Sequence, residues 1–176
     1  MTTRATQKGT HVLRVALQNE PTIYREIEVP STASLYDLPD FIVSALGFDF
    51  DHAFGFYSDL GGDFRASARR FELFADMGEW PDALGVERTR LNDAFPHVGS
   101  VMLMLLDYGD DWRFLVGVIK QGKREPKQRY PGTLESSASL QSSTRSTTTM
   151  RGTGRTTAYV LPTEGYAFLV GWAADR

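Results

Sequence analysis

The stretch from residue 100 to residue 120, SVMLMLLDYGDDWRFLVGVIK, has the clearest structural pattern in the sequence. Ser100 to Leu106 is a continuous apolar run, which is typical of a strand buried in the middle of a sheet. From Trp112 to Lys120 the residues alternate between two faces, which predicts a second strand. Asp107 to Asp111 lies between them and is rich in turn residues, so we predict an antiparallel β-hairpin.

Two more strands and a helix are predicted near the N-terminus. His11–Gln18 and Thr22–Val29 both alternate and are separated by a short break, which indicates a second hairpin. A helix follows from about Asp37 or Leu38, because Pro39 is tolerated only in the first helical turn, and it stops at Gly47. The order strand, strand, helix resembles the start of a β-grasp fold.

The middle of the sequence completes an α+β pattern. We predict a third strand over Ala53–Tyr57, a loop over Asp59–Asp63, and two further short helices over Arg69–Asp76 and Thr89–Phe95. The fold class expected is therefore α+β, with a mainly antiparallel sheet.

Domain boundaries follow from changes in composition. Residues 1–10 are polar and are expected to be flexible, and residues 11–132 form the α+β domain. Ser and Thr make up roughly half of residues 133–157, a composition that cannot supply a core and predicts disorder. Residues 158–176 regain some apolar pattern and are expected to form a weakly structured tail, with a terminal hairpin as one interpretation.

Composition excludes several classes of protein. A hydrophobic content of 41% fits a folded globule, and a net charge of −3 gives no broad positive field for nucleic acid. The sequence has no cysteine, which excludes disulfides, thiolate zinc sites and cysteine nucleophiles. It has no signal-peptide pattern and no long apolar run, so we expect a cytoplasmic protein with no membrane contact. No cofactor motif is present, and no cofactor is predicted.

Three stretches together resemble the plasmid pRiA4b ORF-3-like family, whose members are also known as TnpR-like passenger proteins of insertion elements. The first runs from Leu13 to Pro30 and is similar to the family's "PPIWR" and "I.VP" opening. The second runs from Leu35 to His52 and is similar to a helix that ends in "MGW" with a histidine a few residues later. The third, Asp107–Trp112, is similar to the "YDFGDxW" signature. The resemblance covers about residues 11–120 and implies no established activity.

The sequence departs from this family at three places. Phe48 replaces the tryptophan of "MGW", and Phe114 replaces a histidine that commonly follows the last motif. Beyond about Ser136, family members usually continue with Gly, Pro and acidic residues, whereas this chain continues with Ser and Thr. One hypothesis is a shifted reading frame after that point, and the alternative is a natural Ser/Thr linker.

The hairpin turn and its surroundings supply a candidate binding surface with aromatic, imidazole and charged groups: His52, Tyr57, Asp107, Tyr108, Asp110, Asp111, Trp112 and Arg113. Tyr-Gly-Asp-Asp holds metal ions in RNA polymerases, but this chain is far too short for a polymerase. The structural interpretation is a tight turn in which Gly109 supplies positive φ, the aspartates accept turn amides, and Trp112 starts a strand on the core face.

Metal binding is a second interpretation of the acidic residues. Asp49, Asp51 and His52, with Asp59 or Asp63, supply ligand types that divalent ions accept, although capping aspartates and a packed or surface histidine explain them too. No metal ligand and no catalytic residue is assigned. His11 and His97 lack a partner pattern and are expected to be surface histidines.

One cationic cluster occurs in the sequence, and it consists of Lys120 and the connection from Gln121 to Arg129. Its candidate phosphate contacts are Lys120, Lys123, Arg124 and Lys127. An exposed basic loop without a ligand is the alternative interpretation.

Three functions remain open from the sequence. The first is a non-catalytic binding module with a protein partner. The second is an accessory of a plasmid or insertion element that contacts DNA through the basic cluster. The third is a metal-dependent enzyme that uses His52, Asp110 and Asp111, and it requires those three residues to lie together.

Overall fold

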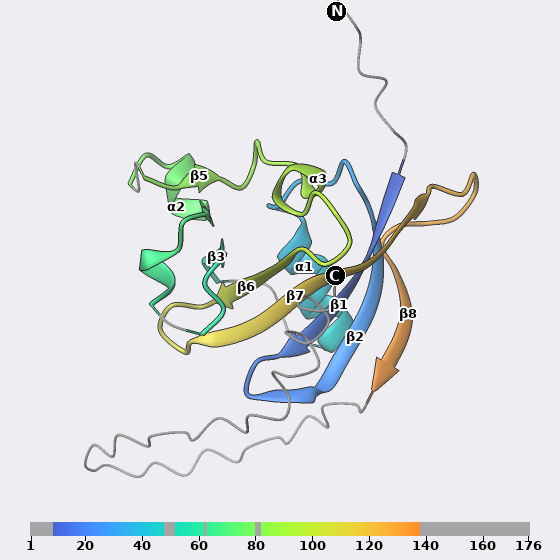
Figure 1. Ribbon diagram of the computed structural model, residues 1–176, viewed down its shortest axis with the longest axis horizontal. Coiled ribbons are helices and arrows are strands. Elements are labelled where there is room, and N and C mark those ends of the chain that lie inside the picture. The colour runs from blue at the N-terminus through green and yellow to red at the C-terminus, as the bar shows by residue number, and fades with distance from the viewer. Residues whose placement is uncertain (1–8, 48–51, 62, 80–81, 138–176) are drawn as a thin grey trace, which may run out of the picture.

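The protein is described from a computed structural model, which describes residues 9–47, 52–61, 63–79 and 82–137. These residues build one mixed sheet with few helices (Figure 1). The strands are β1 (Gly9–Leu17), β2 (Glu20–Pro30), β3 (Phe54–Tyr57), β4 (Arg70–Glu72), β5 (Leu84–Gly85), β6 (Val101–Leu106), β7 (Trp112–Lys123) and β8 (Gly132–Ser137). The helices are α1 (Leu38–Leu46), α2 (Leu73–Asp76) and α3 (Leu91–Ala94), and a 3-10 turn spans Phe64–Ala66.

The eight strands lie in the order β5-β4-β3-β6-β7-β1-β2-β8. Every neighbouring pair is antiparallel except β4 and β5, which run parallel. The two predicted hairpins are confirmed, since β1 pairs with β2 and β6 pairs with β7. β1 and β7 are themselves neighbours, so the two hairpins join in the middle of the sheet.

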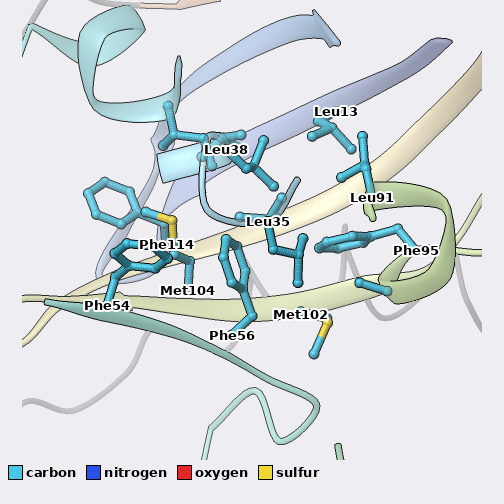
Figure 2. Packing of buried hydrophobic residues seen from close by; sticks show 14 of the residues in the cluster. Leu13, Leu35, Leu38, Phe54, Phe56, Leu91, Phe95, Met102, Met104 and Phe114 are labelled. Carbon is cyan, nitrogen blue, oxygen red and sulfur yellow. The ribbon is translucent and has the colours of Figure 1, made fainter. Parts of the chain in front are cut away.

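The main core lies on one face of this sheet, under α1 and α3. Alternate residues of the central strands point into it, and α1 adds its apolar side (Figure 2). Phe56 and Phe95 meet edge to face with ring centroids 6.4 Å apart, which connects β3 to the segment after α3. Burial of this apolar surface is the main source of the free energy that favours the folded state.

Helix α1 begins and ends where the sequence predicts. Pro39 lies within the first turn, and Gly47 closes the helix at φ 84°. The side chain of Arg25 on β2 is buried, and its Nε donates a 2.9 Å hydrogen bond to the carbonyl of Ala45. A cation at the last carbonyls of a helix is favourable, so Arg25 fixes α1 against β2.

The structure corrects several sequence expectations. Residues 70–72, predicted as helix, form β4, because Phe71 is buried on one face and Glu72 on the other, as in a strand. Residues 132–137 form β8, although disorder was predicted from residue 133, because the outer edge of β2 offers unpaired backbone groups to it. The short edge strand β5 was not predicted, and β1 begins at Gly9, inside the segment expected to be flexible.

Other expectations are outside what the structure tests. The rest of the Ser/Thr-rich segment and the terminal hairpin lie outside the described residues, as do Asp49 and Asp51. The order β1-β2-α1 is observed, while the likeness to a β-grasp fold stays a prediction. Within the described part of the chain, no helix is long and apolar enough to cross a membrane.

Candidate functional site

The β6–β7 turn, residues 107–111, is held by a dense set of backbone bonds. The amide of Asp107 donates to the carbonyl of Ala53 at 2.9 Å, and the amide of Asp111 donates to the carbonyl of Asp107 at 2.7 Å. The side chain of Asp107 accepts the amides of Gly109 at 2.8 Å and Asp110 at 3.3 Å. The expectation that turn aspartates accept amides is therefore confirmed for Asp107.

The turn has positive φ at two residues, and neither of them is Gly109, for which positive φ was predicted. Asp107 and Asp111 both have φ 57°, and Gly109 is not among the positive-φ glycines. Aspartate tolerates this region better than most residues, because its short side chain bonds the local backbone. Such conformations persist where the surroundings fix them.

His52 contacts the same aspartate. Its Nδ1 lies 3.2 Å from Asp107 Oδ2, and about half of the imidazole is exposed. The pKa of the Asp107 carboxyl lies below its usual value, first because of the amide of Gly109 and to a lesser extent because of His52. Asp107 thus joins the turn to the segment that precedes β3.

The remaining turn residues face outward. Asp111 Oδ1 lies 2.7 Å from Arg113 Nε, which orients that guanidinium along the start of β7. Asp110 is exposed, and Trp112 is 37% exposed, although it was expected to start β7 on the core face. The end of the hairpin therefore presents acidic and aromatic groups to solvent.

Tyr108 points from the turn into a buried hydroxyl network. Its hydroxyl donates to Glu72 Oε2 at 2.6 Å, the hydroxyl of Tyr57 donates to Glu72 Oε1 at 2.8 Å, and the two hydroxyl oxygens are 2.8 Å apart. Glu72 and Tyr57 are fully buried. Tyr57 was expected at the binding surface but lies in the interior. Burial of its large aromatic ring removes apolar area from water, which stabilises the folded state.

Burial raises the pKa of both tyrosines, and a hydrogen bond to Glu72 adds to the effect in each case. For Tyr57 the second cause is its hydrogen bond with Tyr108, and for Tyr108 it is the bond to Glu72. Both hydroxyls therefore remain protonated donors, and their place is structural support beneath the turn.

Gly55 makes room for this network. A Cβ atom at this position would lie 2.5 Å from the Tyr57 hydroxyl and 2.9 Å from the Tyr108 hydroxyl. Glycine inside a strand often marks such a close approach. Gly55 is the feature of the sequence that indicates a close approach at this place, but the predicted site did not include it, and nothing in the sequence pointed to Glu72.

The residues considered as metal ligands make other contacts in the structure. Asp59 accepts the amide of Gly61 and Asp63 accepts the amide of Arg65, which makes them turn and cap residues. His52 meets Asp107, and Asp111 meets Arg113. Among the residues that the structure describes, no group of three or more His, Cys, Asp or Glu side chains could hold a metal ion.

The four candidate phosphate contacts are all exposed, but two of them are not in a loop. Lys120 and Lys123 belong to β7, which continues to Lys123 beside β1. Arg124 stacks over the ring of Tyr130, 5.3 Å from its centroid, and Lys127 has φ 89°. The cationic cluster is therefore an extension of the sheet with a turn at its end.

His11, expected at the surface, is buried instead. Its Nδ1 lies 2.8 Å from Ser31 Oγ, and its Nε2 lies 3.0 Å from the carbonyl oxygen of Phe95 and 2.8 Å from Gln121 Nε2. Burial lowers the pKa of the imidazole. No pattern in the sequence indicated these partners, because they come from separate segments.

Comparison with known proteins identifies a family and a solved structure with a similar fold. A sequence model of the plasmid pRiA4b ORF-3-like proteins matches residues 10–141. A crystal structure of a protein of unknown function from Methanosarcina mazei Go1 is similar with a TM-score of 0.61 and 19% identity, over 74% of this chain and 70% of that one. That likeness concerns the fold alone. No curated protein matches the chain.

Proposed function

Since the chain belongs to the plasmid pRiA4b ORF-3-like family, for which no activity is established, we propose from its own residues that it is a non-catalytic binding module. The partner is a protein, and the recognition element is the β6–β7 turn with the start of β7. The third stretch of the family resemblance, Asp107–Trp112, lies in this element.

The observation that carries the proposal is a fixed turn with exposed ends. Asp107 binds two amides of its own turn, the backbone of Ala53 and His52, while Tyr108 is tied to Glu72 below. A recognition element that is already ordered loses little conformational entropy on binding. The two left-handed aspartates support the same interpretation, because strained positions concentrate at functional sites.

The chemistry of the exposed groups also suits a protein partner. Tryptophan supplies large contact area with few rotatable bonds, and it is enriched among the residues that dominate binding energy. Beside Trp112, exposed Asp110 and half-buried Arg113 offer groups of both charges. The titratable groups His52, Asp107, Tyr108 and Asp111 are engaged with the protein itself, which favours support of a surface over proton transfer to a substrate.

The test compares three immobilised proteins: the wild type, Trp112→Ala, and Leu134→Ala, in which an equally apolar, 53% exposed side chain on β8 is truncated. A protein retained by the wild type and by Leu134→Ala, but not by Trp112→Ala, is purified and titrated by calorimetry. We expect a defined stoichiometry and a loss of at least about tenfold in affinity for Trp112→Ala, which is about 1.4 kcal/mol.

Tyr36→Ala serves as a second control, because Tyr36 is an aromatic residue with 42% exposure outside the turn. A partner that tolerates Trp112→Ala and Asp110→Ala as well as it tolerates the controls would contradict the turn as recognition element. Turnover of a substrate by the purified protein would contradict the non-catalytic assignment.

A further inference from the structure

The charge of this protein is strongly polarised. Residues 120–129 contain five cations and one acid, a net charge of +4, although the whole chain carries −3. The other residues therefore sum to −7. Every one of the five cations is exposed: Lys120, Lys123, Arg124, Lys127 and Arg129. A local field of this kind attracts polyanions in spite of the acidic remainder.

The end of β7 places two of these cations on opposite faces of the sheet. Lys120 pairs with Val12 and Lys123 with Gly9 on the neighbouring strand β1. Because successive residues of a strand point to opposite faces, side chains three positions apart lie on opposite sides of the sheet. The β7–β8 connection then continues beyond these residues, and Figure 1 shows it reaching out at one corner of the sheet.

The tip of the connection is an ordered turn. The amide of Gln128 donates to the carbonyl of Glu125 at 3.3 Å, with Pro126 and Lys127 at the central positions. Lys127 has φ 89°, a conformation that this kind of turn normally reserves for glycine or asparagine. The tip thus carries a lysine in a left-handed backbone conformation that residues with a side chain rarely adopt.

Contacts on both sides stiffen the connection. Arg124 stacks on Tyr130, whose hydroxyl accepts the amide of Glu125 at 3.1 Å. The acidic neighbour Glu28 accepts hydrogen bonds from Thr10 at 2.6 Å and Gln128 at 3.3 Å, and Glu125 is exposed. Glu28 is thereby engaged at the base of the connection, and the cations extend past it.

We propose that residues 120–129 bind the groove of a nucleic acid duplex, with Lys120 and Lys123 on opposite backbones and Lys127 at the tip. A groove has phosphates along both walls, so it can contact cations on both faces of a sheet edge, and the pairing of β7 with β6 ends at Gly117. A flat acidic surface on a protein or membrane contacts one face at a time. This site is separate from the β6–β7 turn and does not depend on the function proposed for it.

The experiment is a fluorescence anisotropy titration of the full chain into a labelled DNA duplex of mixed sequence, from about 50 mM to about 200 mM salt. The three lysine contacts predict a slope of about −2.7 in log affinity against log salt, so the fourfold rise in salt weakens binding by about fortyfold. Lys120→Gln with Lys123→Gln and Lys127→Gln should flatten that slope by about 0.9 for each contact removed.

Two single variants separate the site from total charge. Lys127→Gln and Arg88→Gln remove one exposed cation each, but only the first belongs to the connection. We expect Lys127→Gln to weaken binding about fivefold to tenfold and Arg88→Gln to change it by less than about twofold. Unfolding curves of all variants confirm that each one is folded.

Three results would overturn the proposal. They are no anisotropy change at the lowest salt, an equal effect of Lys127→Gln and Arg88→Gln, and equally tight binding of polyglutamate or of vesicles rich in anionic lipid. The last result would show a general polyanion surface and not a groove-binding sheet edge.

Discussion

The hydroxyl of Tyr108 donates a 2.6 Å hydrogen bond to the buried carboxylate of Glu72, which ties the β6–β7 turn to the end of β4. The two residues are 36 positions apart in the chain. The turn is therefore supported from the interior as well as by its own backbone, and this support can be removed one atom at a time.

Tyr108→Phe deletes only the hydroxyl and leaves Glu72 with Tyr57 as its donor. We expect a loss of about 1–3 kcal/mol in the free energy of unfolding, because a buried acceptor loses a partner. Tyr36→Phe is the matched control, since Tyr36 is exposed, and it should change stability by less than about 0.5 kcal/mol. Denaturant titrations measure both, and equal effects would contradict the support.

Gly55→Ala should destabilise the protein by about 1–3 kcal/mol, since the new methyl group would overlap the hydroxyls of Tyr57 and Tyr108. Gly132→Ala is the control, because its Cβ atom would meet its nearest neighbour at 3.7 Å, an ordinary contact. Thermal unfolding compares the two. A wild-type melting temperature for Gly55→Ala would mean that the hydroxyl network can accommodate the added methyl group without loss of stability.

Asp107 combines a left-handed backbone with two side-chain bonds to amides. Asp107→Asn keeps an acceptor oxygen and tolerates this backbone, so we expect a small effect, whereas Asp107→Ala loses both features. The ranking in unfolding free energy should be wild type, then Asn, then Ala. Asn and Ala variants of equal stability would show that the side-chain bonds contribute nothing measurable.

His11 makes stability depend on pH. Its pKa in the folded protein is below the ordinary value of 6.5, so the unfolded chain binds a proton first as the pH falls. The contribution of His11 to the free energy of unfolding is therefore fully present above about pH 6.5. It decreases as the pH falls toward the folded pKa, by at most about 1.4 kcal/mol per pH unit. His11→Gln should flatten this dependence between about pH 7 and about pH 5. His97→Gln, which removes an exposed imidazole, is the comparison variant, and an equal flattening by it would contradict the role of His11.

The Ser/Thr-rich tail can be tested in the coding DNA. Residues 136–150 can be encoded by a set of synonymous codons whose reading frame two bases later gives the peptide VGEPPVQYPEYDDD. This peptide is rich in Gly, Pro, aromatic and acidic residues. The triplets ACG-ACG-ACG-ATG for residues 147–150 give its last three aspartates. We expect the gene to contain these codons and its intact protein mass to match the other frame. Codons incompatible with that run, or close relatives that encode the present tail, would establish a natural Ser/Thr linker.

Local sequence patterns predicted those elements whose boundaries and periodicity lie within one short segment. The β6–β7 hairpin, the β1–β2 hairpin and α1 with Gly47 at its end were predictable because alternation, helical spacing and breakers all lie within a few residues of one another. The matched family was likewise indicated by short motifs in the same segments.

Elements that depend on distant partners were not predictable in this way. β4 and β8 are short strands whose formation depends on a neighbouring edge, and the apolar pattern of Arg69–Asp76 fits a helix equally well. The site shows the same division. The turn of Asp107 was visible in the sequence, but the burial of Tyr57, Glu72 and His11 results from packing between separate segments.

The strand order also constrains when the protein can fold during its synthesis. The first hairpin, β1–β2, is enclosed by β7 on one side and β8 on the other, so Val15 meets Val116 and Arg25 meets Ser136. Until the ribosome has released β7, the nascent hairpin has two open edges, and the β2 edge stays open until β8 follows. Edges of this kind recruit chaperones or other chains. Closure of the sheet therefore requires strands from both ends of the domain, and such long-range pairing forms slowly.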